Sequence, residues 1–345
     1  MGAAEKHSGC SRLMKTPRHN GGAVHSRSMR TKNDDCCSSR NGTGGNMSIA
    51  EKEKRAIGYL KAFEPKDEPY YLCYSGGKDS DCIRILAELA GVKADIKHNL
   101  TTVDAPETVH YVQKTIGREN IEHPELTMWQ LIVKKKIPPT RLARYCCAEL
   151  KEKGGKGRMK ITGVRWAESK NRRDNGGVVK ILGKEKTMGK LATENELDFI
   201  KTGKGGIVMN NDNSETRRFV EMCYRTTSTM VNPIIDWEDD EVWEFLHYYG
   251  CESNPLYQCG QKRIGYIGCP LQGFKGMKDD FLLYPKYRAA YVRAFDKMVI
   301  AREQAGLTNN GSWRDGESVM RWWVGDDPNQ MTLEDYFKNV GIDWE

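Results

Sequence analysis

Two groups of residues in this sequence have types and spacings that could carry chemistry. The first is the hexapeptide Ser75-Gly76-Gly77-Lys78-Asp79-Ser80, and the second is a set of four cysteines: Cys146, Cys147, Cys259 and Cys269. Glycines allow backbone N–H groups to turn toward an anion, while the lysine adds charge and the serines add hydroxyl donors. The hexapeptide therefore predicts a phosphate-binding loop, and the cysteines predict a metal site or thiol chemistry.

The hexapeptide differs from the P-loop of common ATPases. In that motif a glycine stands five positions before the second glycine, and Ser or Thr follows the lysine. Here those two positions hold Leu72 and Asp79. An ordinary strand-to-helix turn is the alternative interpretation, but six suitable residues between a strand and a helix favour anion binding.

The elements that must position these residues alternate between helix and strand. Helical spacing covers 49–63, 79–90, 107–117 and 125–136, while short strand-like runs cover 70–74, 94–103, 159–164 and 222–230. This alternation predicts a three-layer α/β/α sandwich with a mostly parallel sheet. Such sheets bind ligands beyond the carboxyl ends of their strands. The candidate site residues at these ends are Asp104, Gly163, Arg165 and Arg172.

Each of the charged candidates has a second interpretation. Arg165 and Arg172 suit bidentate recognition of phosphate or sulfate, or they form a surface ion pair with Glu168. Asp104 either holds a ribose hydroxyl or a metal ion, or it forms a turn before Pro106.

We expect three regions along the chain. Residues 1–46 carry five of the seven net positive charges and are rich in Gly, Ser, Asn and Arg, so they predict a disordered tail, or a remnant of cloning or of an over-extended gene start. The α/β domain covers 47–270, and its Gly- and Lys-rich insert at 174–216 is expected to form a flap or hairpin outside the sheet core. Residues 271–345 predict a helical C-terminal subdomain.

Four segments resemble the phosphoadenosine phosphosulfate (PAPS) reductase-like family of the PP-loop adenine nucleotide alpha hydrolase superfamily. They are the hexapeptide, which is similar to the PP-loop, Val103 to Thr108, Gly163 to Ser169 with Arg172, and Asn232 to Trp237 with Val242-Trp243. The resemblance implies that ATP with Mg²⁺ binds to the hexapeptide, Asp104 and Gly163, and that pyrophosphate leaves. It also implies catalytic roles for Lys78, Arg165 and Arg172.

In the same family, a Cys-Cys pair and a later C-x-x-C-P segment hold a [4Fe–4S] cluster through four thiolates. This chain has Cys146-Cys147 and Cys269-Pro270, but Tyr266 stands where the first cysteine of the later segment would be. The resemblance thus implies a [4Fe–4S] cluster, and Cys259, ten residues before Cys269 on the same glycine-rich loop, is the candidate for the fourth ligand. A three-cysteine cluster with an open iron, a zinc site and thiols without metal are the alternatives.

The resemblance implies an enzyme that activates an acceptor with ATP and transfers sulfur to it with the help of the cluster. Reduction of PAPS or adenosine phosphosulfate and sulfate adenylylation are the alternatives. The reductases use a cysteine in an E-C-G-x-H segment, which does not occur after Cys269 in this sequence. A nucleotide-binding module without activity is the non-enzymatic alternative, and the intact hexapeptide argues against it.

Composition limits the setting of this chemistry. The 345 residues contain no run of about 18 apolar residues, as a membrane span requires. The eleven cysteines are an odd number and argue against a disulfide framework. We expect a cytoplasmic protein whose partners are an adenine nucleotide, a sulfur donor and a sulfur acceptor, either nucleic acid or a small molecule. No membrane partner is expected, and the sequence is compatible with a homodimer.

Overall fold

The computed structural model describes residues 47–183, 185–202, 206–307 and 313–327, so the expected tail at 1–46 lies outside the described residues. Its strands are β1 (Tyr70–Cys73), β2 (Ala94–Asn99), β3 (Ile121–Glu122), β4 (Lys160–Ile161), β5 (Val179–Leu182), β6 (Ile200–Lys201), β7 (Ile207–Met209) and β8 (Ser228–Val231). The helices of the α/β part are α1 (Ile49–Ala62), α2 (Lys78–Ala90), α3 (Pro106–Ile116), α6 (Lys170–Asn175), α7 (Glu185–Glu194), α8 (Ser214–Cys223) and α9 (Asp239–Tyr248). The other helices are α4 (Met128–Lys135), α5 (Tyr145–Leu150), α10 (Gly273–Leu283), α11 (Pro285–Gln304) and α12 (Gly316–Trp323).

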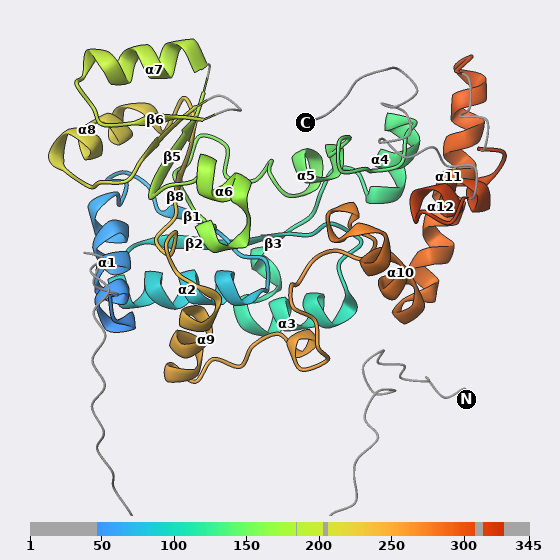
Figure 1. Cartoon of the computed structure of the whole chain (residues 1–345), viewed down its shortest axis with the longest axis horizontal. Coiled ribbons are helices and arrows are strands. Elements are labelled where there is room, and N and C mark those ends of the chain that lie inside the picture. The colour runs from blue at the N-terminus through green and yellow to red at the C-terminus, as the bar shows by residue number, and fades with distance from the viewer. Residues whose placement is uncertain (1–46, 184, 203–205, 308–312, 328–345) are drawn as a thin grey trace, which may run out of the picture.

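The strands form one mixed sheet in the order β3-β2-β1-β4-β8-β5-β7-β6. The first five strands in this order pair in parallel, and the last three are antiparallel to their neighbours. Helices α2 and α3 lie on one side of strands β1 to β3, and α5 and α6 lie on the other side (Figure 1). The predicted α/β fold with a mostly parallel sheet is confirmed.

The central strands are short, and hydrophobic side chains bury them on both faces. Leu72 on β1, Ile161 on β4 and Val231 on β8 pair in register on one face and have no solvent exposure, and Tyr71 on the other face of β1 is 2% exposed. Continuous apolar runs of this kind are typical of parallel strands that helices cover on both sides.

The order of the strands reverses between β1 and β4. From β1 the chain proceeds outward through α2, β2, α3 and β3, and it then returns to place β4 on the other side of β1. In doubly wound sheets the crevice at such a reversal, beyond the carboxyl ends of the strands, is the usual ligand site. The hexapeptide follows β1 and the segment of Gly163 to Arg165 follows β4, so this crevice contains both.

Local signals explain the helices that border this crevice. Ser48 and Glu51 form a reciprocal capping box at the start of α1, with the Glu51 carboxylate accepting from the Ser48 N–H at 2.8 Å. Helix α2 begins directly after the hexapeptide and ends at Gly91, whose φ of 66° is the left-handed conformation that glycine adopts without strain.

The insert differs from its prediction. Strand β5 pairs antiparallel with β8, and β7 and β6 extend the sheet beyond it, so residues 174–216 do not form a flap outside the core. Val179 and Ile181 are fully buried in the same core as the central strands. The many glycines and lysines of the insert made it resemble a surface segment. Its few apolar residues nevertheless alternate along β5, so that Val179 and Ile181 face the core. The strand predicted at 222–230 is also shorter, since α8 continues to Cys223.

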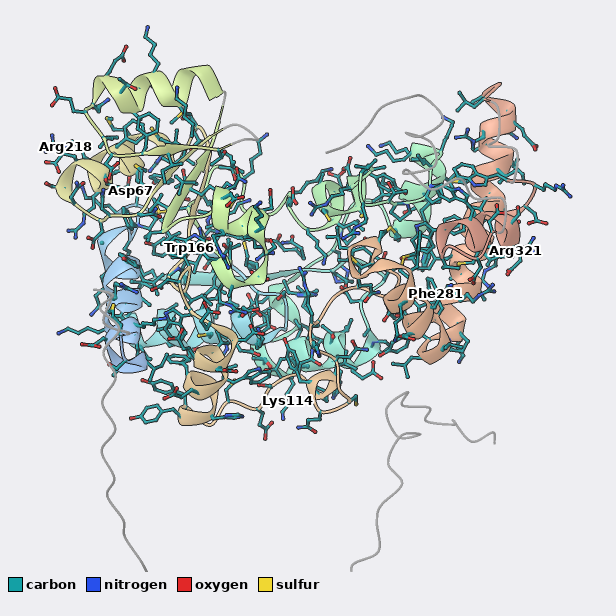
Figure 2. The ribbon with its side chains drawn as sticks, viewed as in Figure 1. Asp67, Lys114, Trp166, Arg218, Phe281 and Arg321 are labelled. Atoms are coloured by element: carbon teal, nitrogen blue, oxygen red, sulfur yellow. The ribbon has the colours of Figure 1, made fainter. Side chains whose placement is uncertain are left out.

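A second hydrophobic core lies beside the sheet and joins α4 and α5 to α10, α11 and α12. Figure 1 shows α4 next to α11 and α12, and Phe281 lies within this lobe in Figure 2. The Tyr291 ring packs edge-on against Phe281, at 5.6 Å between centroids, and 4.8 Å from the Trp323 ring. The helical lobe therefore combines the C-terminal helices with a segment from the middle of the chain. Of the C-terminal residues, 308–312 and 328–345 lie outside the described part.

No helix within the described ranges is both long and apolar enough to cross a membrane.

Candidate functional site

The phosphate loop is held in shape by its own residues. Gly76 has φ of 73°, and a side chain there would place its Cβ 2.8 Å from Val112 Cγ2, so only glycine fits. The Gly77 N–H donates to Ser80 Oγ at 3.1 Å, and that hydroxyl donates to the Gly77 carbonyl at 2.7 Å. Ser75 Oγ donates to Ser80 Oγ at 3.3 Å. The loop thus has its turn formed at the positive end of the α2 dipole.

A tyrosine hydroxyl occupies the first backbone donor of α2. The Lys78 N–H donates to Tyr257 Oη at 2.9 Å. Burial raises the pKa of Tyr257, so the phenol remains protonated. The Trp243 ring packs edge-on against Tyr257, at 5.0 Å between centroids. A neutral oxygen therefore lies where an anion would accept a hydrogen bond from the helix N-terminus.

Lys78 and Arg165 meet beside the loop and share two carboxylates. Lys78 Nζ lies 3.2 Å from Asp79 Oδ1 and 3.0 Å from Asp239 Oδ1. Arg165 Nε lies 2.8 Å from Asp79 Oδ1, and its Nη2 pairs with Asp239. Lys78 is 5% exposed, so its ammonium group is buried beside the loop. The two cations and two carboxylates form a quartet with no net charge.

Arg165 lies deeper than a surface ion pair would. Its side chain is 1% exposed, and Nη1 donates to the Trp237 carbonyl at 3.0 Å. Although burial opposes ionisation, the hydrogen bonds from Arg165 and Lys78 leave the pKa of Asp239 below its usual range. Gly163, two residues earlier, lets the chain pass close to α2: a Cβ there would lie 2.9 Å from the Asp79 carbonyl oxygen.

Arg172 is placed differently from Arg165. It belongs to α6, pairs with Glu168 one turn earlier and is half-buried. Burial, together with the neighbouring Arg263 guanidinium, lowers the pKa of Arg172 to about 10. The ion pair with Glu168 that was considered for Arg172 is therefore present. The surroundings of Arg172 nevertheless contain further guanidinium groups, such as that of Arg263.

Asp104 forms the turn that follows β2. Its Oδ2 accepts from the Thr101 N–H at 2.6 Å, and its backbone pairs with Tyr266 in an isolated β-bridge. Asp104 also lines a cavity of about 170 Å³, together with Ser75 of the phosphate loop and Lys151. Asp104 therefore forms the turn that was one of its two interpretations, and it also lines a cavity.

The thiols gather in the second hydrophobic core, next to Tyr266. Cys146 and Cys147 are buried in α5, and Cys146 Sγ lies 3.1 Å from Tyr266 Oη. The Cys269 N–H donates to the Tyr266 carbonyl at 3.2 Å. A hydrogen bond from the Cys146 thiol, with another from Arg144 at 3.6 Å, lowers the pKa of Cys147 to about 5. The same hydrogen bond and burial raise the pKa of Cys146.

Comparison with known proteins decides the family. The family description "Phosphoadenosine phosphosulfate reductase domain" matches residues 69–272. This chain belongs to the PAPS reductase domain family. An uncharacterized protein of Methanocaldococcus jannaschii is 24% identical over 284 residues, which are 77% of this chain and 57% of that protein. An adenosine 5'-phosphosulfate reductase of Bacillus cereus is 33% identical over 66 residues, 18% of this chain and 28% of the reductase. The chain thus spans less than two thirds of either relative.

Two solved structures are similar at low sequence identity. The PAPS reductase of Candida auris, in a phosphate complex, has 14% identity and a TM-score of 0.37 over 64% of this chain and 96% of that chain. The FMN adenylyltransferase of Candida glabrata, with FAD and inorganic pyrophosphate, has 13% identity and a TM-score of 0.33 over 65% of this chain and 67% of that chain.

The cysteines of this PAPS reductase-family chain do not fit a four-thiolate cluster in their present arrangement. Throughout the part of the chain that the structure describes, no three His, Cys, Asp or Glu side chains are grouped so that they could hold a metal ion. The Tyr266 phenol contacts Cys146 where the family pattern has a cysteine. Cys259 is half-buried on the loop of Tyr257 and does not belong to the core that contains Cys146, Cys147 and Cys269.

The structure adds residues that sequence reasoning missed. Asp239 and Tyr257 contact Lys78, but neither belongs to the segments on which the sequence predictions rest. Lys151 lines the cavity, and its Nζ also lies 4.9 Å from the centre of the Tyr266 ring. His98 on β2 carried no sequence signal, since a single histidine in a strand is commonly a core residue.

Proposed function

We propose that this chain binds ATP, as its Mg²⁺ complex, on the phosphate loop, releases pyrophosphate and transfers sulfur to an acceptor, either nucleic acid or a small molecule. The observation that carries the proposal is the meeting of Lys78 and Arg165 with the N-terminus of α2 at the crevice where the strand order reverses. Three sources of positive charge converge there on one loop. Such convergence stabilises charge that develops on a leaving phosphate.

In this proposal an oxygen of the acceptor attacks the α-phosphorus of ATP, and the bond to the β-phosphate breaks. The backbone N–H groups of the loop and Lys78 stabilise the leaving pyrophosphate. Arg165 stabilises charge at the α-phosphate, because its guanidinium lies beside the start of α2. Phosphate oxygens replace the Asp79 and Asp239 carboxylates as partners of the two cations. A hydrosulfide-level sulfur then attacks the activated carbon, and AMP leaves with the acceptor oxygen.

Support for the sulfur step comes from where the thiols lie. Ser75 of the phosphate loop and Lys151 line the same cavity, and Lys151 contacts the ring of Tyr266, whose hydroxyl lies beside Cys146. The Cys146-Cys147 pair is therefore linked to the proposed nucleotide site through these two side chains. Arg144 stabilises Cys147 as the thiolate, which is the nucleophilic form of cysteine. Assistance by iron stays a prediction, which the present arrangement of the thiols does not support.

Calorimetric titration with ATP, adenosine phosphosulfate and PAPS tests the nucleotide. We expect ATP to bind and pyrophosphate to be released when an acceptor is supplied. Tight PAPS or adenosine phosphosulfate binding without ATP binding would instead favour a reductase, the alternative that the Bacillus cereus relative supports over a short stretch. Pyrophosphate exchange that requires sulfate would favour a sulfate adenylyltransferase.

Metal analysis of anaerobically purified protein tests the cluster. Because Tyr266 occupies the position of a ligand, we expect the wild type to lack a stable four-iron cluster and Tyr266→Cys to gain iron. Iron in the wild type that disappears in Cys146→Ser, Cys147→Ser and Cys269→Ser would contradict this expectation. In that case Cys259→Ser shows whether Cys259 is the fourth ligand, and zinc in place of iron would identify the other metal considered.

A further inference from the structure

A single histidine lines the cavity between the phosphate loop and Lys151. The cavity lies at the carboxyl ends of β1 and β2, which are neighbours in the sheet (Figure 1), and it begins at Ser75, the first residue of the phosphate loop. A nucleotide with its phosphates on the loop would therefore extend its other end into this space. A cavity of about 170 Å³ is suited to one planar ring system and not to a whole nucleotide.

The proton position of His98 is determined by its surroundings. The side chain is 4% exposed, and Nδ1 lies 3.0 Å from the Tyr74 carbonyl oxygen. Because a carbonyl oxygen can only accept, Nδ1 must donate, and Nε2 of the neutral ring is then an acceptor. Burial lowers the pKa of His98, which keeps the ring neutral.

Nε2 has no hydrogen-bond partner among the residues that the structure describes, although it is buried. Buried polar atoms in native proteins almost always have a partner, so this unpaired acceptor, on a residue that lines the cavity, points to a ligand that donates. Asp104, which also lines the cavity, cannot supply the donor, because a carboxylate only accepts and its Oδ2 already accepts from the Thr101 N–H.

We propose that His98 Nε2 accepts a hydrogen bond from the exocyclic amino group of the nucleotide base and thereby selects adenine; this inference rests on the proposed function. Adenine presents an N–H donor at its 6-position, whereas hypoxanthine and guanine present a carbonyl oxygen there. Two acceptors facing each other in a buried site repel. His98 is thus a specificity-determining residue that takes no part in the chemical step.

The test measures the affinities of ATP, ITP, 2′-deoxy-ATP and inorganic pyrophosphate for the wild type, His98→Ala, His98→Gln and the control His123→Ala, in which an exposed histidine is removed. We expect the wild type and the control to bind ATP roughly tenfold to hundredfold more tightly than ITP. His98→Ala should bind the two equally, and His98→Gln should recover part of the preference, because its amide oxygen can accept. Pyrophosphate affinity should not change in any variant.

Each result decides something. Equal affinity of the wild type for ATP and ITP overturns the inference without any variant, even if His98→Ala does not fold. A preference for ATP that survives in folded His98→Ala also overturns it. Equal ATP and ITP affinity, with loss of affinity for 2′-deoxy-ATP, would assign Nε2 to the ribose and overturn the base assignment. Binding of pyrophosphate without any nucleotide would contradict the proposed function and not only the role of His98.

Discussion

The phosphate loop and the cysteine cluster, formed by Cys146, Cys147 and Cys269 beside Tyr266, differ in how complete they are. The loop has its turn, its internal hydrogen bonds and its paired cations in place. The cysteine cluster contains three cysteines and the phenol of Tyr266, and within the described residues it forms no group that could hold a metal ion. The loop has the arrangement expected for its ligand, whereas the cysteine cluster departs from the family pattern at one residue.

The difference reflects how each region is assembled. Six consecutive residues make the loop, so it survives as long as those six are retained. The cysteine cluster needs residues from α5 and from the loop before α10, and each of these two segments contributes only one or two cysteines. Replacing a single ligand, as at Tyr266, is sufficient to remove a four-thiolate site. Family resemblance therefore predicts a site made of one continuous segment, such as the phosphate loop, better than a site made of separate segments.

The largest effect should follow from Arg165→Met. Removing the buried guanidinium leaves Lys78 as the remaining cation beside Asp79 and Asp239, and since Asp239 is largely exposed, we expect a loss at the lower end of the about 3–5 kcal/mol that breaking a buried ion pair costs. Urea denaturation measures the loss in the free energy of unfolding. The matched control is Arg172→Met, whose half-exposed pair with Glu168 should contribute at most about 1 kcal/mol. Equal small losses would show that the charged quartet is not a structural unit.

Lys78→Ala should act on catalysis. In the proposed reaction Lys78 contacts the leaving phosphate, and loss of such a cation costs about 2–4 kcal/mol in the transition state, or roughly a thirtyfold to a thousandfold in rate. The rate of pyrophosphate release measures it, with Lys66→Ala as the surface control. Release at a near wild-type rate in Lys78→Ala would remove this loop from the proposed mechanism.

On the thiol side, Cys146→Ala should raise the pKa of Cys147. The Cys146 hydrogen bond is the main cause that lowers the pKa to about 5, and a hydrogen bond to a charged group is worth about 1.5–3 kcal/mol, which is about one to two pH units. Thiolate absorbance followed as a function of pH, with Cys147→Ser as the blank, measures the shift. Since the thiolate exists only above its pKa, the variant should react more slowly with alkylating agents at pH 6. An unchanged titration would mean that Arg144 alone stabilises the thiolate.

Tyr266→Phe should have the smallest effect. It removes the hydrogen bond to Cys146 and leaves the ring in place, which costs about 1 kcal/mol in the free energy of unfolding. Tyr248→Phe, at a tyrosine that is 80% exposed, is the control and should be neutral. A loss of several kcal/mol in the free energy of unfolding would indicate that the Tyr266 phenol holds the whole cysteine cluster in place.

The fold was predictable because the alternation of helix and strand repeats over many residues. The insert was not, because whether a short Gly-rich segment pairs with β8 depends on partners far away in the chain. Distance along the chain also explains the missed site residues. Asp239 and Tyr257 contact Lys78 across 161 and 179 positions, and no local pattern reports such a contact. Within the hexapeptide, where local chemistry decides, the sequence indicated the shape of the loop.

The Tyr257 hydroxyl on the Lys78 N–H has a consequence for turnover. Any anion that enters must displace this hydrogen bond, so its net gain in binding is smaller than the number of its contacts would indicate. Weak competitors such as single inorganic phosphate ions are disfavoured more than a chain of phosphates, which gains several contacts for one lost. In the proposed reaction, the hydroxyl would return to the helix terminus as pyrophosphate departs. The loop would thereby limit product inhibition, because the Tyr257 hydroxyl replaces the departing anion as acceptor.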